Sequence, residues 1–261
     1  MANIYAVVTG ASSGIGLEIS NVLARQGYDM ILVARRRDRL EKLKKYLSKR
    51  YGTESVIIEE DLSTREGCER LYDKIKDYDI EVFVNNAGFG DAGPFTETDL
   101  NKDVQMIDVN VRAVHILTKL MAIYFRKKNG GYLLNVASSA GLFPAGPYMA
   151  TYYAAKAYVT SLTSALAEEL REAGSDVYVG ALCPGPVNTE FNDVANVQFA
   201  LKGISPKYCA AYAIDQMFKR KEIIVPTARM KLVVFIQRLA TRRFTVRTTA
   251  GQQKKKIVLS S

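Results

Sequence analysis

The chain has 261 residues, of which 48% are hydrophobic and 24% charged, a composition typical of a soluble globular domain. No signal peptide or membrane-spanning run is expected, and one histidine with three scattered cysteines argues against a metal site. The net charge of +9 resides in the tail, because residues 219–261 carry +11 and the remainder −2. We therefore expect a cytoplasmic protein that binds no nucleic acid.

Short β-branched runs alternate with longer helical patterns along the first 226 residues. The strand-like runs are 4–9, 29–34, 55–60, 81–86, 131–138, 176–183 and 222–226. The first two helical patterns end near residues 26 and 50. Four more cover 63–77, 98–127, 151–173 and 205–219. Such alternation produces βαβ units and a parallel sheet covered on both faces. The sequence predicts an α/β fold over residues 1–226, with one doubly wound, Rossmann-like parallel sheet of about seven strands, and a basic extension over 227–261.

A glycine-rich segment, TGASSGIG over residues 9–16, separates the first predicted strand from the first helix. Gly10 permits a tight turn, Gly14 lets the backbone approach a phosphate, and Gly16 permits close helix packing. The helix N-terminus would then offer its N–H groups to a pyrophosphate. A glycine-rich turn without a ligand is the alternative. The segment also fits the G-x-S-x-G elbow of hydrolases, but the only histidine, His115, lies in a helical stretch.

Three arginines, Arg35, Arg36 and Arg37, follow the second predicted strand, and the first acid after them is Asp38. Dinucleotide-binding proteins specific for NAD carry a carboxylate here, which would repel a 2′-phosphate, whereas a guanidinium binds one. The alternative, solvated arginines at a helix start, is unfavourable because cations there oppose the helix dipole. The sequence therefore favours NADP(H).

Two adjacent tyrosines begin the helix predicted over 151–173. Tyr152 and Lys156 are four residues apart and share a helix face, and Tyr153 is three residues from the same lysine. A free phenol has a pKa near 10, and a nearby ammonium group, reinforced by an oxidised nicotinamide, lowers that pKa by stabilising the phenolate. Either tyrosine could serve as an acid–base group beside a bound dinucleotide.

Over residues 3–226 the sequence resembles the short-chain dehydrogenase/reductase family of the Tyr-x-x-x-Lys type. The resemblance rests on TGASSGIG, on NNAG at 85–88, on Tyr152-x-x-x-Lys156 and on the Pro184-Gly185 segment. The resemblance implies that Tyr152 is the acid–base residue and that Tyr153 is a packing residue without a catalytic role.

Further roles follow from the same resemblance. It implies that Asn110 holds a water in a proton relay, and it leaves Ser138 and Ser139 as alternatives for the catalytic serine, with Ser138 favoured. The implied cofactor-binding residues are Gly10, Ser12, Ser13, Gly14, Ile15, Gly16, Arg35, Arg36, Asp61, Leu62, Asn86, Ala87, Gly88, Tyr152, Lys156, Pro184, Gly185, Val187 and Thr189.

The implied activity is hydride transfer between NADPH and a carbonyl or secondary alcohol. The segment 186–204 occupies the position of a substrate lid, and its apolar side chains suit an aliphatic, acyl-chain or steroid-like ketone; they are Val187, Phe191, Val194, Val197 and Phe199. The alternative is a non-catalytic dinucleotide-binding regulatory or scaffold protein. The resemblance also implies a homo-dimer or tetramer that pairs through the helices at 98–127 and 151–173.

Beyond Pro226, a helical pattern with basic flanks has apolar residues at Met230, Val233, Val234 and Leu239. Such a helix suits peripheral contact with an anionic membrane. It could instead cap the substrate pocket or an oligomer interface.

Overall fold

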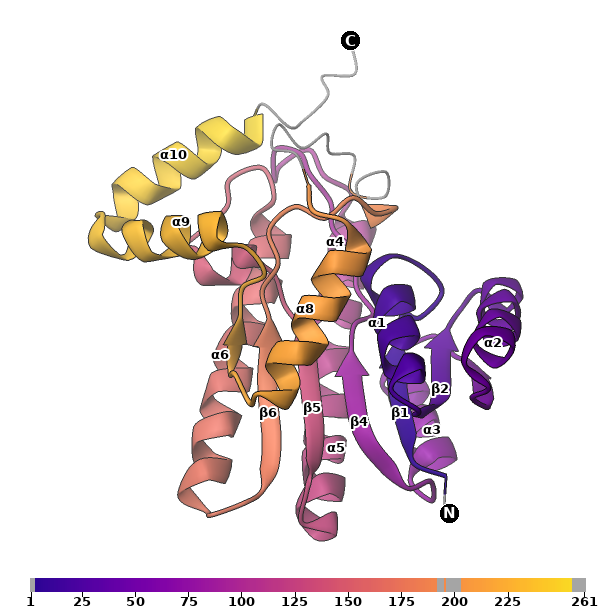
Figure 1. Ribbon diagram of the computed structural model, residues 1–261. Helices are drawn as coiled ribbons and strands as arrows, with labels where there is room; N and C mark the ends of the chain where they lie inside the picture. The colour runs from indigo at the N-terminus through magenta and orange to yellow at the C-terminus, as the bar shows by residue number, and fades with distance from the viewer. Residues whose placement is uncertain (1–2, 192–194, 196–202, 255–261) are drawn as a thin grey trace.

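A parallel sheet forms the centre of the computed structural model, which describes residues 3–191, 195 and 203–254 (Figure 1). In the described residues the sheet has seven strands in the order β3-β2-β1-β4-β5-β6-β7. They are β1 (Tyr5–Thr9), β2 (Asp29–Ala34), β3 (Ser55–Glu59), β4 (Ile80–Asn85), β5 (Gly131–Val136), β6 (Val177–Leu182) and β7 (Ile223–Ile224). The predicted α/β fold with a doubly wound parallel sheet is confirmed.

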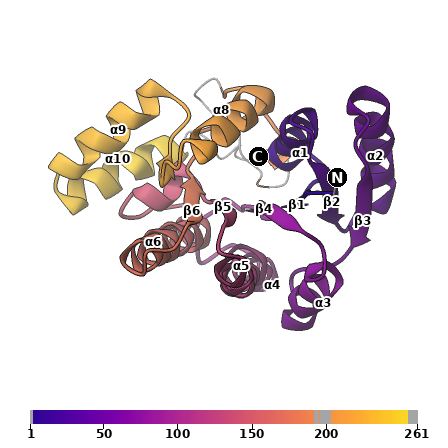
Figure 2. The same cartoon turned by 60° about the horizontal axis from the view of Figure 1, so that its bottom comes forward.

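Helices cover both faces of the sheet, as its nearly continuous apolar strands require (Figure 2). One face carries α1 (Gly14–Arg25), α2 (Arg37–Tyr51) and α8 (Pro206–Phe218). The other carries α3 (Arg65–Ile75), α4 (Leu100–Ile107), α5 (Val114–Lys128) and α6 (Ala150–Glu172). The chain runs from β1 outward to β3 and then returns to β4 on the other side of β1. This reversal opens a crevice at the carboxyl ends of β1 and β4, where such sheets bind ligands.

The helix predicted over 98–127 is interrupted in the structure. A π-helical turn, η1 (Asp108–Ala113), joins α4 to α5. A π turn accommodates an extra residue in a helix and leaves its backbone bonds irregular, and it often occurs at functional sites. The predicted strand 131–138 is also shorter, since β5 ends at Val136 and a 3-10 turn, η2 (Ser139–Leu142), follows.

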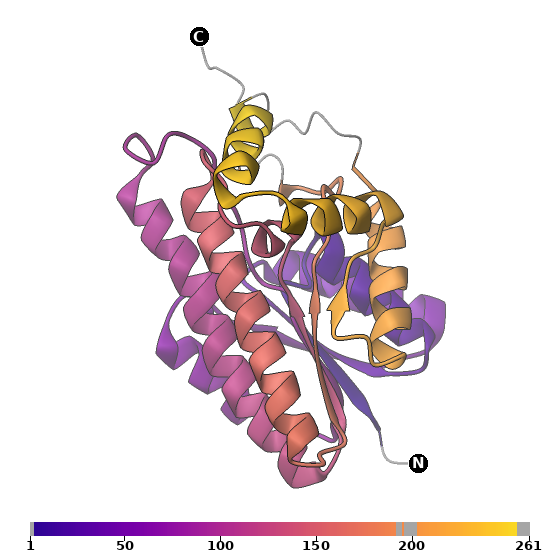
Figure 3. The same cartoon turned by 90° about the vertical axis from the view of Figure 1, so that its left-hand side faces the viewer.

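The basic extension forms two helices, α9 (Ala228–Leu239) and α10 (Arg242–Lys254), at the end of the sheet to which the strands point (Figure 3). Gln237 Nε2 donates to Leu142 O at 2.7 Å, and Gln253 donates to the hydroxyl of Tyr153. Of the apolar residues predicted for this helix, Val234 is buried and Leu239 is 77% exposed. No helix among the described residues is long and apolar enough to cross a membrane.

Candidate active site

The glycine loop between β1 and α1 lies against the end of β4. The side-chain nitrogen of Asn86, Nδ2, donates to Thr9 O at 2.9 Å and to Gly10 O at 3.3 Å. Gly10 has a φ of +66°, and a Cβ there would lie 2.8 Å from that same nitrogen. A Cβ on Gly16 would lie 2.6 Å from Gly10 O. Only glycine fits these two positions, so the motif holds the loop and the first turn of α1 close to β4.

The first turn of α1 is open to an anion. Ser13, the residue that precedes α1, makes no side-chain bond to that turn, and its hydroxyl accepts a hydrogen bond from Arg36 instead. The first N–H groups of an α-helix have no partner within the helix, and a phosphate is one of the groups that satisfy them. The start of α1 therefore fits the pyrophosphate of a dinucleotide.

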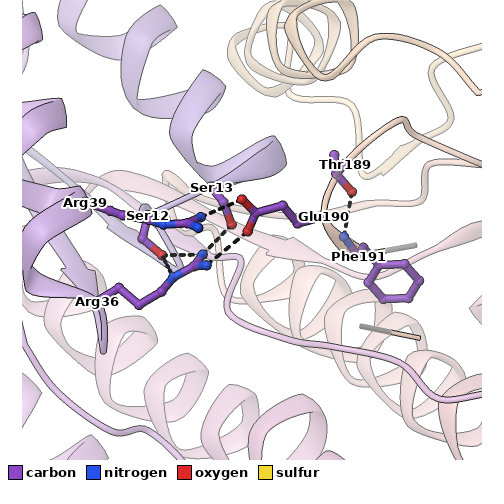
Figure 4. A network of polar contacts seen from close by, with 7 residues as sticks. All are labelled: Ser12, Ser13, Arg36, Arg39, Thr189, Glu190 and Phe191. Carbon is purple, nitrogen blue, oxygen red and sulfur yellow. Dashed lines mark hydrogen bonds and ion pairs between the residues drawn. The ribbon is translucent and has the colours of Figure 1, made fainter. Parts of the chain in front are cut away.

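Two arginines converge beside this loop (Figure 4). Arg36 donates to Ser12 Oγ at 3.0 and 3.2 Å and to Ser13 Oγ at 2.8 Å. Its remaining terminal nitrogen lies 3.0 Å from a carboxylate oxygen of Glu190, and Arg39 lies 2.5 Å from the other oxygen. Arg35 also lines the cleft with an exposed side chain, whereas Arg37 pairs with Glu41.

Arg39 and Glu190 are not among the residues predicted from the sequence. Arg39 lies three residues after Arg36 and therefore on the same face of α2, so helical spacing could have indicated it. Glu190 follows Thr189 in the segment after β6, 154 residues from Arg36, and no local pattern connects the two.

At the other end of the cleft, Tyr152 and Lys156 project from α6. The Lys156 Nζ lies 5.9 Å from the centre of the Tyr152 ring and donates to Val136 O at 2.9 Å. The Ser138 hydroxyl accepts from Ala140 N at 3.1 Å and is the group that lowers the pKa of the Tyr152 phenol. Ser139 begins η2, and its backbone N–H donates to Pro184 O at 2.8 Å. Of the two serines, Ser138 is the one whose side chain influences the pKa of Tyr152.

Burial governs the ionisation of this pair. It raises the pKa of Tyr152 to about 12, against a smaller lowering by the bond from Ser138. It lowers the pKa of Lys156 to about 8. Burial thus leaves the pKa of Tyr152 raised although an ammonium group lies nearby. The lowering that the sequence predicts for a lysine together with a bound oxidised nicotinamide stays a prediction.

Asn110 lies in the π turn η1 and is fully buried. Its Oδ1 accepts from Phe89 N at 3.1 Å and its Nδ2 donates to Phe89 O at 2.7 Å. A Cβ on Gly88 would lie 2.7 Å from Asn110 Oδ1, so this position suits glycine. Asn110 holds the strand-end segment 88–89 against the helix. The water that the sequence assigns to Asn110 stays a prediction.

Tyr153 points away from Lys156. Its ring lies against Gly146, and its hydroxyl accepts from Gln253 of α10. Since α10 fastens Tyr153 outside the cleft, Tyr152 is the tyrosine that faces it.

The substrate side of Tyr152 is apolar. Phe191 packs on it with ring centres 5.4 Å apart, and the two belong to a cluster with Met149 and Ala195. Val187 is buried and pairs with Ile204. Val194, Val197 and Phe199 lie outside the described residues.

One cleft of about 290 Å³ connects Arg35 and Arg36 with Tyr152. The predicted residues that line it are Gly10, Ser12, Ser13, Gly14, Ile15, Arg35, Arg36, Asp61, Leu62, Asn86, Ala87, Gly88, Tyr152, Lys156, Pro184, Val187 and Thr189. Five predicted residues do not line it: Gly16, Asn110, Ser138, Ser139 and Gly185. Of these, Gly185 lies beneath Met230 of α9.

Comparisons with known proteins agree with this geometry. A family model described as short chain dehydrogenase matches residues 5–198. A very-long-chain 3-oxoacyl-CoA reductase from Neurospora crassa is 34% identical over 67% of this chain and 54% of its own length. An uncharacterized oxidoreductase from Staphylococcus saprophyticus is 36% identical over 72% of this chain and 75% of its own length. The chain thus spans only about half the length of the first relative.

Two solved structures share the fold. A short-chain dehydrogenase from Sphingobium yanoikuyae in complex with NADPH has a TM-score of 0.81 at 27% identity, covering 90% of this chain and 94% of its own. One from Burkholderia phymatum in complex with NAD has a TM-score of 0.82 at 24% identity, covering 96% of both chains. The family model covers most of the chain, and the cleft lies where the doubly wound sheet reverses. The chain therefore belongs to the short-chain dehydrogenase/reductase family, oxidoreductases that bind a nicotinamide dinucleotide.

Proposed function

We propose that this oxidoreductase uses NADPH to reduce a carbonyl group on an apolar substrate, or to run the reverse oxidation of a secondary alcohol. One observation carries the proposal: the same cleft has Arg36, bonded to Ser12 and Ser13 of the glycine loop, at one end and Tyr152 with Lys156 at the other. Guanidinium groups bind the 2′-phosphate that distinguishes NADPH from NADH. When bound, NADPH supplies the hydride.

The residues of the chain supply the polar part of the reaction. Tyr152 and Ser138 hold the carbonyl oxygen by hydrogen bonds, which stabilise the negative charge that develops on it. Tyr152 gives that oxygen a proton, and its raised pKa keeps the phenol protonated at neutral pH. Lys156, held by Val136 O, keeps a positive charge beside the phenol. Asn110 keeps the segment 88–89 in place.

The proposed substrate is a ketone with an aliphatic, acyl-chain or steroid-like body. Phe191 and Met149 surround Tyr152 with apolar surface, which favours such a body over a sugar or a small polar ketone. The name of the Neurospora crassa relative, a very-long-chain 3-oxoacyl-CoA reductase, supports an acyl-chain 3-ketone among these choices.

Titration with NADPH and NADH, followed by nicotinamide fluorescence, tests the cofactor, and a screen of long-chain 3-oxoacyl thioesters and cyclic ketones tests the substrate. We expect Arg36→Gln to weaken NADPH binding at least tenfold while NADH binding stays unchanged. Tyr152→Phe should bind NADPH normally and lose turnover by about 10²–10⁴-fold. Preference for NADH, or full activity of Tyr152→Phe, would refute the proposal; binding without turnover of any ketone would favour a non-catalytic dinucleotide-binding protein.

We also propose that the protein is cytoplasmic and contacts an anionic membrane through α9. Leu232, Phe235, Ile236 and Leu239 follow helical spacing, and each is more than half exposed. Residues 227–254 contain seven Lys or Arg and no acid. An apolar helix face with basic flanks is typical of helices that lie in a bilayer interface, and its charge complements anionic headgroups.

Vesicle sedimentation tests this contact. Phosphatidylglycerol-rich vesicles should sediment the protein at low salt, phosphatidylcholine vesicles should not, and Phe235→Ser/Leu239→Ser should reduce binding at least fivefold. Tyr46→Ser, which removes another exposed aromatic side chain from α2, is the matched control. The membrane proposal would be overturned if the double variant sedimented as much as the parent. It would also be overturned if the parent formed a dimer through α9 and the double variant did not.

Self-association is the remaining proposal. Leu100, Val104 and Ile107 of α4, Ile123 of α5 and Tyr158 of α6 are exposed on the helices that the family resemblance assigns to pairing. We expect a homo-dimer or tetramer by light scattering, and Val104→Asp/Ile107→Asp should shift it toward the monomer.

A further inference from the structure

Glu190, which lines the cleft, bridges Arg36 and Arg39. Its Oε2 lies 3.0 Å from Arg36 and its Oε1 lies 2.5 Å from Arg39, so each carboxylate oxygen binds one guanidinium (Figure 4). These two arginines hold the pKa of Glu190 below its ordinary value. The carboxylate is therefore ionised at neutral pH, and the arginine pair already binds one anion.

The donors around this carboxylate suit a phosphate monoester. Arg36 is fixed by Ser12 and Ser13, both of which carry hydroxyls at the edge of the same cleft. Guanidinium groups and hydroxyls are the groups that bind a tetrahedral dianion, and a dianion attracts two cations more strongly than a carboxylate does. Glu190 thus occupies the position that the 2′-phosphate of NADPH needs.

We propose that Glu190 is a specificity-determining residue that competes with the 2′-phosphate of the cofactor for Arg36 and Arg39. The inference rests on the proposed use of NADPH. A dinucleotide with a 2′-hydroxyl leaves the Glu190 bridge intact. A 2′-phosphate displaces Glu190 from both arginines, because the two anions would repel each other at one site.

Displacement of Glu190 acts on the catalytic end of the cleft through its neighbour. Phe191 follows Glu190 directly, and its ring lies on Tyr152. The same ring packs so closely on Gly90 that a Cβ there would lie 2.5 Å from it. Because the two side chains share one short backbone segment, release of Glu190 frees Phe191 to leave Tyr152. Binding of the phosphorylated cofactor is thereby coupled to the position of Phe191 against Tyr152.

Glu190→Gln tests the competition, since it removes the charge and keeps the shape. The bridge is half exposed, with side-chain exposures of 48% for Glu190, 41% for Arg36 and 39% for Arg39, so its strength is modest. We expect NADPH to bind the variant about three- to tenfold more tightly, with NADH affinity changed less than twofold. Glu41→Gln removes a carboxylate that pairs with Arg37 on the same helix and is the control for charge alone.

An unchanged ratio of NADPH to NADH affinity in Glu190→Gln, or weaker NADPH binding, would overturn the inference. If the proposed use of NADPH is itself wrong, the result is different. The parent chain would then not bind NADPH, or Arg36→Gln would bind it as tightly as the parent.

A second measurement follows Phe191 itself. The chain has no tryptophan, so Phe191→Trp introduces a single fluorophore next to Tyr152. We expect 2′,5′-ADP, which carries the phosphate but no nicotinamide, to change the tryptophan emission, and 5′-ADP to leave it unchanged. Adding Glu190→Gln should reduce the response to 2′,5′-ADP at least threefold. Equal changes in emission with the two nucleotides would show that Phe191 does not respond to the 2′-phosphate, and would refute the coupling between Glu190 and Phe191.

Discussion

Lys156 donates a hydrogen bond to the carbonyl oxygen of Val136 at 2.9 Å, and this bond holds the ammonium group at the end of β5. The ammonium is buried there, within 5.9 Å of the Tyr152 ring centre, and burial lowers its pKa to about 8. The site thus keeps a charged group beside the acid–base residue at a cost in stability.

That cost predicts a pH dependence. The pKa of Lys156 lies at about 8 in the folded chain and at 10.5 ordinarily, so the unfolded chain binds more protons between these values. Stability contributed by this site therefore rises with pH across that window. Relative to Lys156→Met, the parent chain should gain about 1–3 kcal/mol in unfolding free energy between pH 7 and pH 10.5. Urea unfolding at several pH values measures the difference, and a constant difference would contradict the lowered pKa.

Ser138 and Ser139 should differ sharply in their contribution to activity. The Ser138 hydroxyl lowers the pKa of the Tyr152 phenol, whereas Ser139 contacts Pro184 through its backbone N–H. We expect Ser138→Ala to lower kcat/KM for ketone reduction by about 10²-fold, in the range measured for the loss of one donor to a developing oxyanion. Ser139→Ala should change it less than about threefold, because it keeps the backbone bond. A larger loss for Ser139→Ala would reverse the assignment.

Gly16 should tolerate no side chain. A Cβ there would lie 2.6 Å from Gly10 O, a backbone atom that cannot move without disturbing the glycine loop. Gly16→Ala should therefore lower the unfolding free energy by about 1–3 kcal/mol or more and weaken dinucleotide binding. Gly130, whose Cβ would meet nothing within 4 Å, is the matched control, and Gly130→Ala should be nearly neutral. Similar unfolding midpoints for the two variants would contradict the close packing.

Asn110 should matter for stability as well as for activity. Its carboxamide makes two hydrogen bonds with the backbone of Phe89, and the side chain is fully buried. Asn110→Ala leaves the partly buried N–H and C=O of Phe89 without these partners, so we expect about 1–3 kcal/mol less unfolding free energy. Turnover per folded molecule should also fall, because segment 88–89 lines the cleft beside Lys156. Unchanged turnover would limit Asn110 to a structural role.

The sequence by itself determined the fold and the position of the cleft. Runs of apolar residues at strand and helix periods specify a covered parallel sheet, and polar motifs at the strand ends, such as TGASSGIG and NNAG, meet at its carboxyl edge. The steric limits of glycine act within a few residues, so the roles of Gly10 and Gly16 could be predicted locally.

Only the tertiary structure decided which groups meet across long distances in the chain. It brought Glu190 to Arg36 and Arg39, and Gln253 to Tyr153, through contacts that no local pattern encodes. It also set the direction of the Tyr152 pKa, because desolvation depends on everything packed around a group, whereas spacing indicates only which neighbours are near. The regular helical pattern over 98–127 likewise contains no signal for the π turn at Asn110, whose side chain bonds the backbone of Phe89.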